Sequence, residues 1–102
     1  MAQTPEGRVK KKVRSVLDAL GAWYYMPAAS PYGRRGIPDF VICANGQAFF
    51  IETKANKKGR LTGLQALVRE EIEMANGGYF LVYDDETLEQ AGVAIRRAMD
   101  QD

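Results

Sequence analysis

The sequence predicts a small α/β domain whose elements follow the order α-β-β-β-α-β-α. Three segments repeat apolar residues at helical spacing, four shorter segments are β-rich, and Asn45-Gly46 joins two of these in a hairpin pattern. The chain has 102 residues, of which 46% are hydrophobic and 26% are charged, and this is typical of one folded domain. We therefore expect a single domain over residues 1–102.

The first helix begins at Thr4-Pro5-Glu6, which combines an N-cap residue, a proline at the first helical position and an acid in the first turn. Gly21 ends this helix. Its apolar stripe consists of Val9, Val13, Val16, Leu17 and Leu20. Glu6 lies three residues before Val9, so we expect its carboxylate on the buried stripe rather than in solvent.

Three strands are expected after the first helix. Ala22–Met26 is short and aromatic, and its aromatic residues fit either the core or stacking on nucleic-acid bases. Pro27–Gly36 contains two prolines and two glycines, which predicts a loop. Pro38–Cys43 and Ala48–Lys54 are β-rich runs separated by Asn45-Gly46, which predicts a hairpin with a type I′ turn.

The second half of the chain predicts a helix, a strand and a final helix. The helix runs from Thr62 to Asn76 and ends at a glycine pair. Its expected buried face consists of Leu64, Leu67, Val68, Ile72 and Ala75. Tyr79–Tyr83 is a buried strand, and Asp84 or Asp85 caps the last helix. That helix carries on one face Leu88, Ala91, Ile95 and Met99.

The hairpin turn fixes a register, because a two-residue turn pairs Ala44 with Gln47. The same register places Asp39 opposite Glu52, and directly opposed Cβ atoms lie about 4.5–5.5 Å apart. Lys54 points to the same face as Glu52, since the two residues are two positions apart in one strand. The sequence therefore predicts two carboxylates and one ammonium group at one spot.

Such a pair of carboxylates needs a compensating charge, because two unit charges roughly 4 Å apart repel by about 4 kcal/mol at an effective dielectric constant of about 20. Lys54 supplies one positive charge, and a divalent cation with oxygen ligands supplies two. The alternatives are that Lys54 alone neutralises the pair, or that the three groups end exposed at the strand termini.

Composition excludes several kinds of chemistry. With one cysteine and no histidine, the chain cannot form an internal disulfide, a cysteine-rich zinc site or a triad that uses histidine. No apolar run approaches the roughly 20 residues of a membrane span, and no apolar stretch follows the charged start. We therefore expect no membrane segment, no secretory signal and a cytoplasmic location.

The net charge of +1 hides an asymmetry between the two parts of the chain. Residues 1–60 carry eleven Lys and Arg against four acids, a balance of +7, and residues 61–102 carry three Arg against nine acids, a balance of −6. This division favours one face for a polyanion, although charge runs on helices are also common as solvated faces.

The motif residues resemble a known superfamily. Pro38-Asp39, twelve intervening residues and then Glu52-Thr53-Lys54 are similar to the PD-(D/E)XK nucleases, and the elements between Thr4 and Tyr83 are similar to their common core. The stretch from residue 35 to residue 40, with Gln65 on the next helix, more narrowly resembles the VRR-NUC family. The resemblance implies a restriction-endonuclease-like fold, in which helices flank a mixed central sheet.

The resemblance implies cleavage of DNA phosphodiesters with Mg²⁺ or Mn²⁺. In the family, carboxylates at the positions of Asp39 and Glu52 bind the metal, together with the main-chain carbonyl at Thr53. The lysine at the position of Lys54 orients or deprotonates the attacking water. The acid at the position of Glu6 reaches the site directly or through water, although a first-turn acid also complements the helix dipole.

Gln65 has two interpretations. Thr62 and Gln65 have the spacing of a capping box, in which the glutamine side chain accepts from the N–H of the cap residue. The family resemblance instead places Gln65 near the nucleophile or the DNA, as a further residue of the catalytic site.

Basic residues in the loops beside the hairpin are candidates for contact with the DNA backbone, which positions a protein without reading sequence. They are Arg34, Arg35, Lys57, Lys58 and Arg60. Lys10 and Lys11 on the first helix, followed by Lys12, extend this basic track. The alternative for all of them is ordinary solubility.

The resemblance also bears on assembly. Free-standing members of the family resemble phage and bacterial Holliday-junction resolvases that work as homodimers, and a two-fold dimer suits a symmetric junction. We therefore expect a structure-selective DNA endonuclease with no small-molecule cofactor. The alternatives are a flap or nicking nuclease, a non-catalytic DNA-binding domain with the same fold, and an interaction module whose acidic half docks a basic partner.

Overall fold

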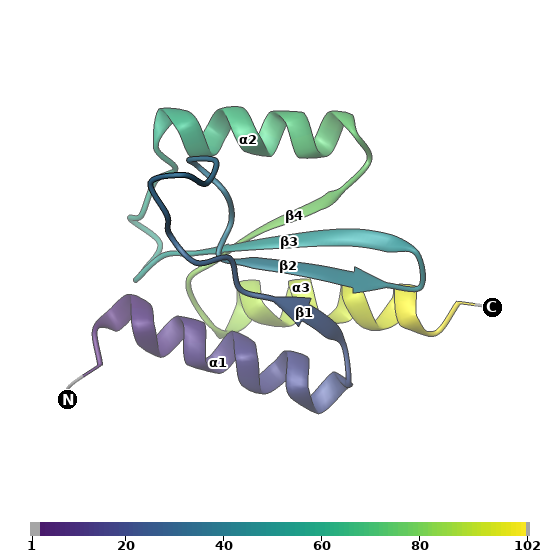
Figure 1. The fold of residues 1–102 in the computed structure, drawn as a ribbon. Coiled ribbons are helices and arrows are strands. Elements are labelled where there is room, and N and C mark those ends of the chain that lie inside the picture. Colours follow the sequence, from purple (N-terminus) through teal and green to yellow (C-terminus); the bar gives the residue numbers. More distant parts are fainter. Residues whose placement is uncertain (1–2, 102) are drawn as a thin grey trace.

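The computed structural model describes residues 3–101 and has the predicted element order (Figure 1). The ends of the expected domain, Met1, Ala2 and Asp102, lie outside the described residues. The elements are α1 (Pro5–Leu20), β1 (Trp23–Tyr25), β2 (Phe40–Ala44), β3 (Gln47–Thr53), α2 (Gly63–Met74), β4 (Gly78–Val82) and α3 (Asp85–Met99).

The four strands form one mixed sheet in the order β1-β2-β3-β4. The first three strands pair antiparallel, and β4 pairs parallel to β3 because α2 carries the chain back across the sheet between them. Helix α2 lies on one side of the sheet, and α1 and α3 lie on the other (Figure 1). The fold class predicted from the sequence is therefore confirmed.

The β2–β3 hairpin has the predicted turn and register. Asn45 and Gly46 both adopt positive φ, 52° and 80°, as a type I′ turn requires. The ladder runs from the Ala44–Gln47 pair to the Phe40–Ile51 pair. Strand β2 begins two residues later than predicted, so Asp39 lies directly before its first residue and the ladder does not include the predicted pair of Asp39 and Glu52.

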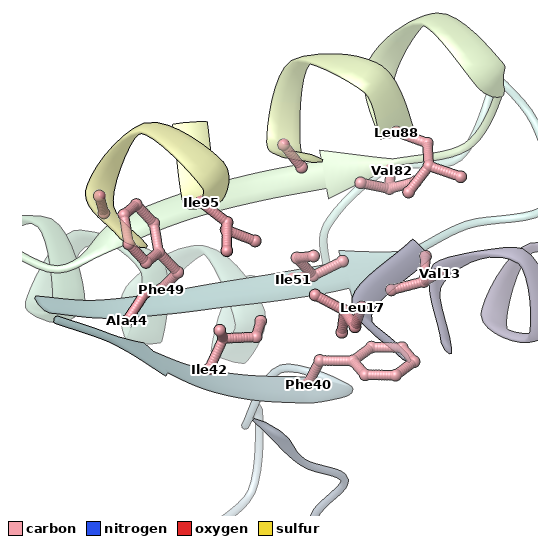
Figure 2. Close-up of a cluster of buried hydrophobic side chains, with 12 residues drawn as sticks. Val13, Leu17, Phe40, Ile42, Ala44, Phe49, Ile51, Val82, Leu88 and Ile95 are labelled. Carbon is pink, nitrogen blue, oxygen red and sulfur yellow. The ribbon is translucent and has the colours of Figure 1, made fainter. Parts of the chain in front are cut away.

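The main core lies between the sheet and the pair α1–α3 (Figure 2). The predicted caps of these helices form, since Thr4 accepts from Gly7 N, Gly21 adopts φ 70° and Asp84 accepts from Thr87 N. Fully or nearly fully buried side chains of this core include Val13, Leu17, Phe40, Ile42, Ile51, Val82 and Ile95. Within residues 3–101, no helix has both the length and the apolar character needed to span a membrane.

Helix α2 differs from its predicted amphipathic pattern. Only Val68 of the expected apolar face is buried, whereas Leu64 and Leu67 are 46% and 52% exposed. The reason is that polar residues of α2 face the sheet: Gln65 bonds Glu52, and Arg69 lies over the ring of a β4 tyrosine. The turn after α2 also differs, because Asn76 rather than a glycine adopts the left-handed conformation, with φ 66°.

The aromatic residues of strand β1 are divided between the core and the surface. Tyr24 packs against the core, but Trp23 and Tyr25 are 63% and 56% exposed. The strand is three residues long and lies at the edge of the sheet, beyond the part that α2 covers. Its two outward rings therefore have no helix packed over them within the described residues.

Candidate active site

Asp39 is held at the start of β2 by the strand next to it. Its Oδ2 atom accepts hydrogen bonds from the main-chain N–H and the hydroxyl of Thr53, at 2.9 Å and 2.5 Å. Thr53 is fully buried at the end of β3, so both donors are fixed by the sheet. The hydroxyl of Thr53 thus orients Asp39, a role that the sequence motif, which involved only its carbonyl group, did not indicate.

Glu52 lies on the α2 side of the sheet and is only 4% exposed. Burial, followed by the negative charge of Asp39, raises the pKa of its carboxyl group from 4.5 to about 7, while Lys54 acts in the opposite direction. The negative charge of Asp39 therefore disfavours the charged form of Glu52, and a bound proton or cation would relieve this repulsion.

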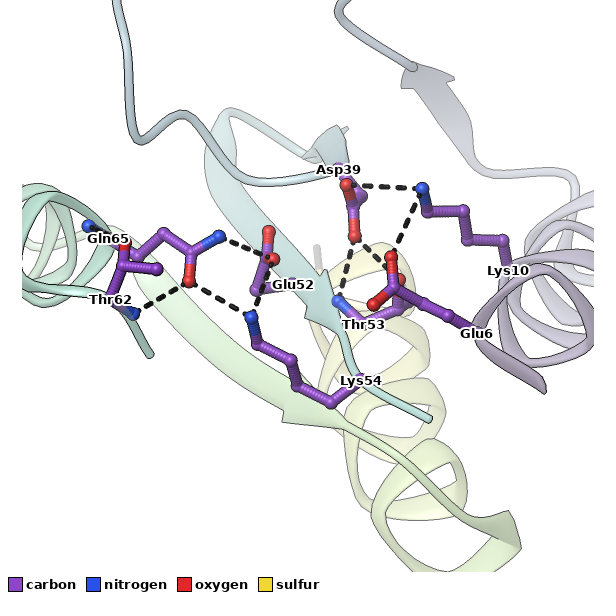
Figure 3. Close-up of polar contacts among 8 residues, drawn as sticks. All are labelled: Glu6, Lys10, Asp39, Glu52, Thr53, Lys54, Thr62 and Gln65. Atoms are coloured by element: carbon purple, nitrogen blue, oxygen red, sulfur yellow. Dashed lines mark hydrogen bonds and ion pairs between the residues drawn. The ribbon is translucent and has the colours of Figure 1, made fainter. Parts of the chain in front are cut away.

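Lys54 and Gln65 complete a polar network with Glu52 (Figure 3). The Nζ atom of Lys54 lies 3.8 Å from Glu52 Oε2 and donates to Gln65 Oε1 at 3.1 Å. Gln65 Nε2 donates to the same Glu52 oxygen at 3.0 Å. Gln65 Oε1 also accepts from the N–H of Thr62, so the capping box and the site contact, which the sequence left as alternatives, occur together.

Gly59 supports the stem of Lys54, which no sequence signal indicated. A Cβ atom at Gly59 would lie 2.6 Å from Lys54 Cβ and 2.9 Å from its Cγ, closer than carbon atoms can approach. The loop therefore packs directly against the aliphatic part of the lysine and restricts where its ammonium group can point.

We expect Gly59→Ala to lower any cleavage activity about tenfold or more, because the added methyl group displaces Lys54 from its position beside Glu52. Initial cleavage rates of both proteins on one DNA substrate measure this effect. Gly63→Ala is the matched control, since a Cβ at Gly63 meets no atom within 4 Å. Equal rates for Gly59→Ala and the unmodified protein would show that the position of the lysine stem is unimportant.

Glu6 and Lys10 enter the site from α1, one helical turn apart. The Nζ atom of Lys10 lies 3.5 Å from Glu6 Oε2 and 3.7 Å from Asp39 Oδ1. The side chain of Glu6 is 43% exposed, so the expectation that it lies on the buried stripe is wrong, and its carboxylate is open to solvent. Lys10, expected on a DNA-binding track, instead belongs to this cluster.

The oxygen donors of the site suit a divalent cation that needs few protein ligands. Among residues 3–101, no group of three or more Asp, Glu, His or Cys side chains is close enough to hold an ion. Glu6, Asp39 and Glu52 therefore do not form a three-carboxylate group among these residues, and the predicted donor set that remains is Asp39 and Glu52 with the carbonyl of Thr53. Mg²⁺ typically keeps several waters and uses one or two carboxylates, which is compatible with this set.

The predicted DNA-contacting residues differ in whether their side chains are paired with other groups of the chain. Arg34 is paired with Glu71 of α2, and Arg60 donates to the carbonyl groups of Lys57 and Gly59. Lys11 lies in a groove between α1 and α3 rather than in the site. The side chains that remain exposed on the loops beside the hairpin include Arg35, Lys57 and Lys58.

Tyr79 on β4 is a further buried residue that sequence reasoning missed. It is 7% exposed, and its hydroxyl group has no hydrogen-bond partner among residues 3–101. The guanidinium of Arg69 lies 4.9 Å from the centre of its ring. Burial, followed by the negative charge of Glu52, raises the pKa of the phenol well above its usual range. Nothing in the sequence distinguishes this tyrosine from an ordinary strand residue.

Comparison with known proteins agrees with this fold. No protein-family model and no curated protein matches the sequence. A solved structure described as a "VRR_NUC domain" does match: it is 25% identical, the TM-score is 0.75, and the match covers 85% of this chain and 92% of that chain. Fold and site together define a nuclease-like α/β domain. The match supports membership of the chain in the VRR-NUC family, as the motifs indicated.

Proposed function

We propose that this protein is a metal-dependent endonuclease that hydrolyses DNA phosphodiester bonds. The observation that supports this most directly is the network of Glu52, Lys54 and Gln65, in which the negative charge of Asp39 also acts on Glu52. Binding of DNA alone would not require a buried glutamate beside an aspartate, because both repel a phosphate backbone. A divalent cation bound at the site would offset the electrostatic repulsion between the two carboxylates.

Each residue then has a defined task. Asp39 and Glu52 would hold Mg²⁺ or Mn²⁺ with the carbonyl of Thr53, and Glu6 would take part through water. When bound, such an ion supplies a Lewis acid that polarises a phosphate oxygen and lowers the pKa of water. Lys54 would hold the attacking water or stabilise charge on the phosphate, since Gln65 and Gly59 restrict its ammonium group.

A cavity beside the site offers a place for the DNA strand. Its volume is about 560 Å³, and it is lined by residues 27–31 and 33–39, so it opens at Asp39. Arg34 and Arg35 belong to this wall, and Lys57 and Lys58 lie on the other loop that flanks the hairpin. We infer that these basic loops hold the backbone on either side of the scissile phosphate.

We further propose that the protein acts as a homodimer on branched DNA. A domain of 11.3 kDa offers little surface to a duplex, and two sites related by a two-fold axis suit a symmetric four-way junction. Light scattering after size-exclusion chromatography should give about twice the chain mass. A monomer at micromolar concentration would remove the argument for junction selectivity and leave flap or nicking activity.

A cleavage panel tests the proposed function. Four-way junction, flap, duplex and single-stranded DNA are incubated with Mg²⁺, with Mn²⁺ and with EDTA, and products are resolved on denaturing gels. We expect cleavage only with metal, and fastest on the junction. Salt-sensitive DNA binding without cleavage would indicate a non-catalytic DNA-binding domain, and no DNA binding at all would indicate a protein-interaction module.

A further inference from the structure

Both carboxylate oxygens of Asp39 are occupied by groups of this chain (Figure 3). Oδ2 accepts two hydrogen bonds from Thr53, and both donors belong to a fully buried residue of the sheet. Oδ1 lies 3.7 Å from the ammonium group of Lys10. A cation that binds Asp39 must therefore approach Oδ1, because Oδ2 is already committed to two rigid donors.

Lys10 can leave Asp39 without unfolding any element. Its side chain is 35% exposed, its flexible stem starts from the surface of α1, and Glu6, four residues earlier on the same helix, is its second partner at 3.5 Å. The contact with Thr53, by contrast, is made in part by the main chain of β3. Of the two groups that hold Asp39, Lys10 is thus the exchangeable one.

We propose that Lys10 is a competing counter-ion, which occupies Asp39 in the metal-free protein and is displaced toward Glu6 when a divalent cation binds. This inference rests on the proposed metal site. Two cations close to one carboxylate oxygen repel each other, so the ammonium group and the ion compete. Lys10 is a positioning residue: it neutralises Asp39 until the ion arrives, at the expense of metal affinity.

Metal binding itself, independent of cleavage, tests the exchange. The dissociation constant for Mn²⁺ is measured by isothermal titration calorimetry at pH 7.5 for the unmodified protein, Lys10→Gln and Lys10→Arg. Lys12→Gln is the matched control, because Lys12 lies on the same helix and pairs with Asp85, at 3.1 Å, outside the site. We expect Lys10→Gln to bind Mn²⁺ about two- to fivefold more tightly, with the other two variants unchanged.

A chemical readout separates displacement from a general effect of charge. Lysine side chains are acetylated briefly with an N-hydroxysuccinimide ester, with and without Mn²⁺, and the rate at each position is measured by mass spectrometry. We expect the rate at Lys10 to increase when Mn²⁺ is present, because its ammonium group loses one partner. The rate at Lys12 should stay constant.

The outcomes distinguish the two proposals. If the unmodified protein binds Mn²⁺ and Asp39→Asn abolishes this binding, the metal site exists. In that case, an unchanged or weaker affinity for Mn²⁺ in Lys10→Gln overturns the exchange alone. An unchanged acetylation rate at Lys10 does the same. If the unmodified protein binds no Mn²⁺, or if Asp39→Asn binds it equally well, the proposed metal site fails and the exchange fails with it.

Discussion

Asp39→Asn is expected to reduce DNA cleavage about 1,000-fold or more, because it removes a negative charge that would hold the catalytic ion, and metal catalysis supplies several kcal/mol. The fold should survive the change. An asparagine carbonyl oxygen can still accept from the N–H and hydroxyl of Thr53, and Lys10 keeps Glu6 as a partner. The loss would therefore report on chemistry rather than on stability.

DNA binding separates this prediction from a general defect. Fluorescence anisotropy with a labelled four-way junction in EDTA should give an affinity equal to or higher than that of the unmodified protein, because the variant repels phosphate less. Glu52→Gln should behave in the same way. Asp18→Asn is the control and should cut normally. Asp18 lies near the end of α1, far along the helix from the site, where its carboxylate accepts from the hydroxyl of Tyr24. An Asp39→Asn protein that cuts at the normal rate would refute the site.

The second large effect is a loss of stability at higher pH in the absence of metal. Burial, reinforced by Asp39, raises the pKa of Glu52 from 4.5 to about 7. Between these values the folded protein holds a proton that the unfolded chain releases, so the free energy of unfolding falls as the pH rises through this range and levels off above about pH 7. The full shift corresponds to about 3 kcal/mol.

Urea unfolding at pH 5, 6, 7 and 8 in EDTA measures this dependence. Glu52→Gln should lose most of the slope, and Glu89→Gln, at an exposed position of α3, should retain it. Mg²⁺ or Mn²⁺ should raise the melting temperature more at pH 8 than at pH 5.5, because the ion and the proton compete for Glu52. If the free energy of unfolding depended on pH in the same way for the unmodified protein and Glu52→Gln, the explanation by a buried carboxylate would be wrong.

Features that depend on neighbouring residues in the chain could be predicted. The caps at Thr4 and Thr62 and the turn at Asn45-Gly46 are formed by side chains and backbone conformations within a few residues. The hairpin register follows from that turn. The proximity of Glu52 and Lys54 follows from their spacing of two residues along one extended segment. Local chemistry was thus sufficient for the element order and for the centre of the candidate site.

Features that depend on how elements pack could not be predicted. Glu6 was expected to be buried and Lys10 to lie on a DNA track, yet the packing of α1 places Lys10 against Asp39, with Glu6 one helical turn before it. Leu64 and Leu67 were expected in the core, but α2 turns its polar side, with Gln65, toward Glu52. A periodic pattern shows which residues share a face, not what that face meets.

Tertiary contacts alone also explain the supports of the site. The hydroxyl of Thr53, at the end of β3, donates to Asp39 at the start of the neighbouring strand β2. The loop that contains Gly59 packs against Lys54, and the parallel pairing of β3 and β4 buries Tyr79 on the side of Glu52. These contacts join residues whose relation is set by the three-dimensional path of the chain. The sequence motifs therefore predicted which side chains form the candidate site. How those side chains are oriented, and which charges neutralise one another, depended on packing.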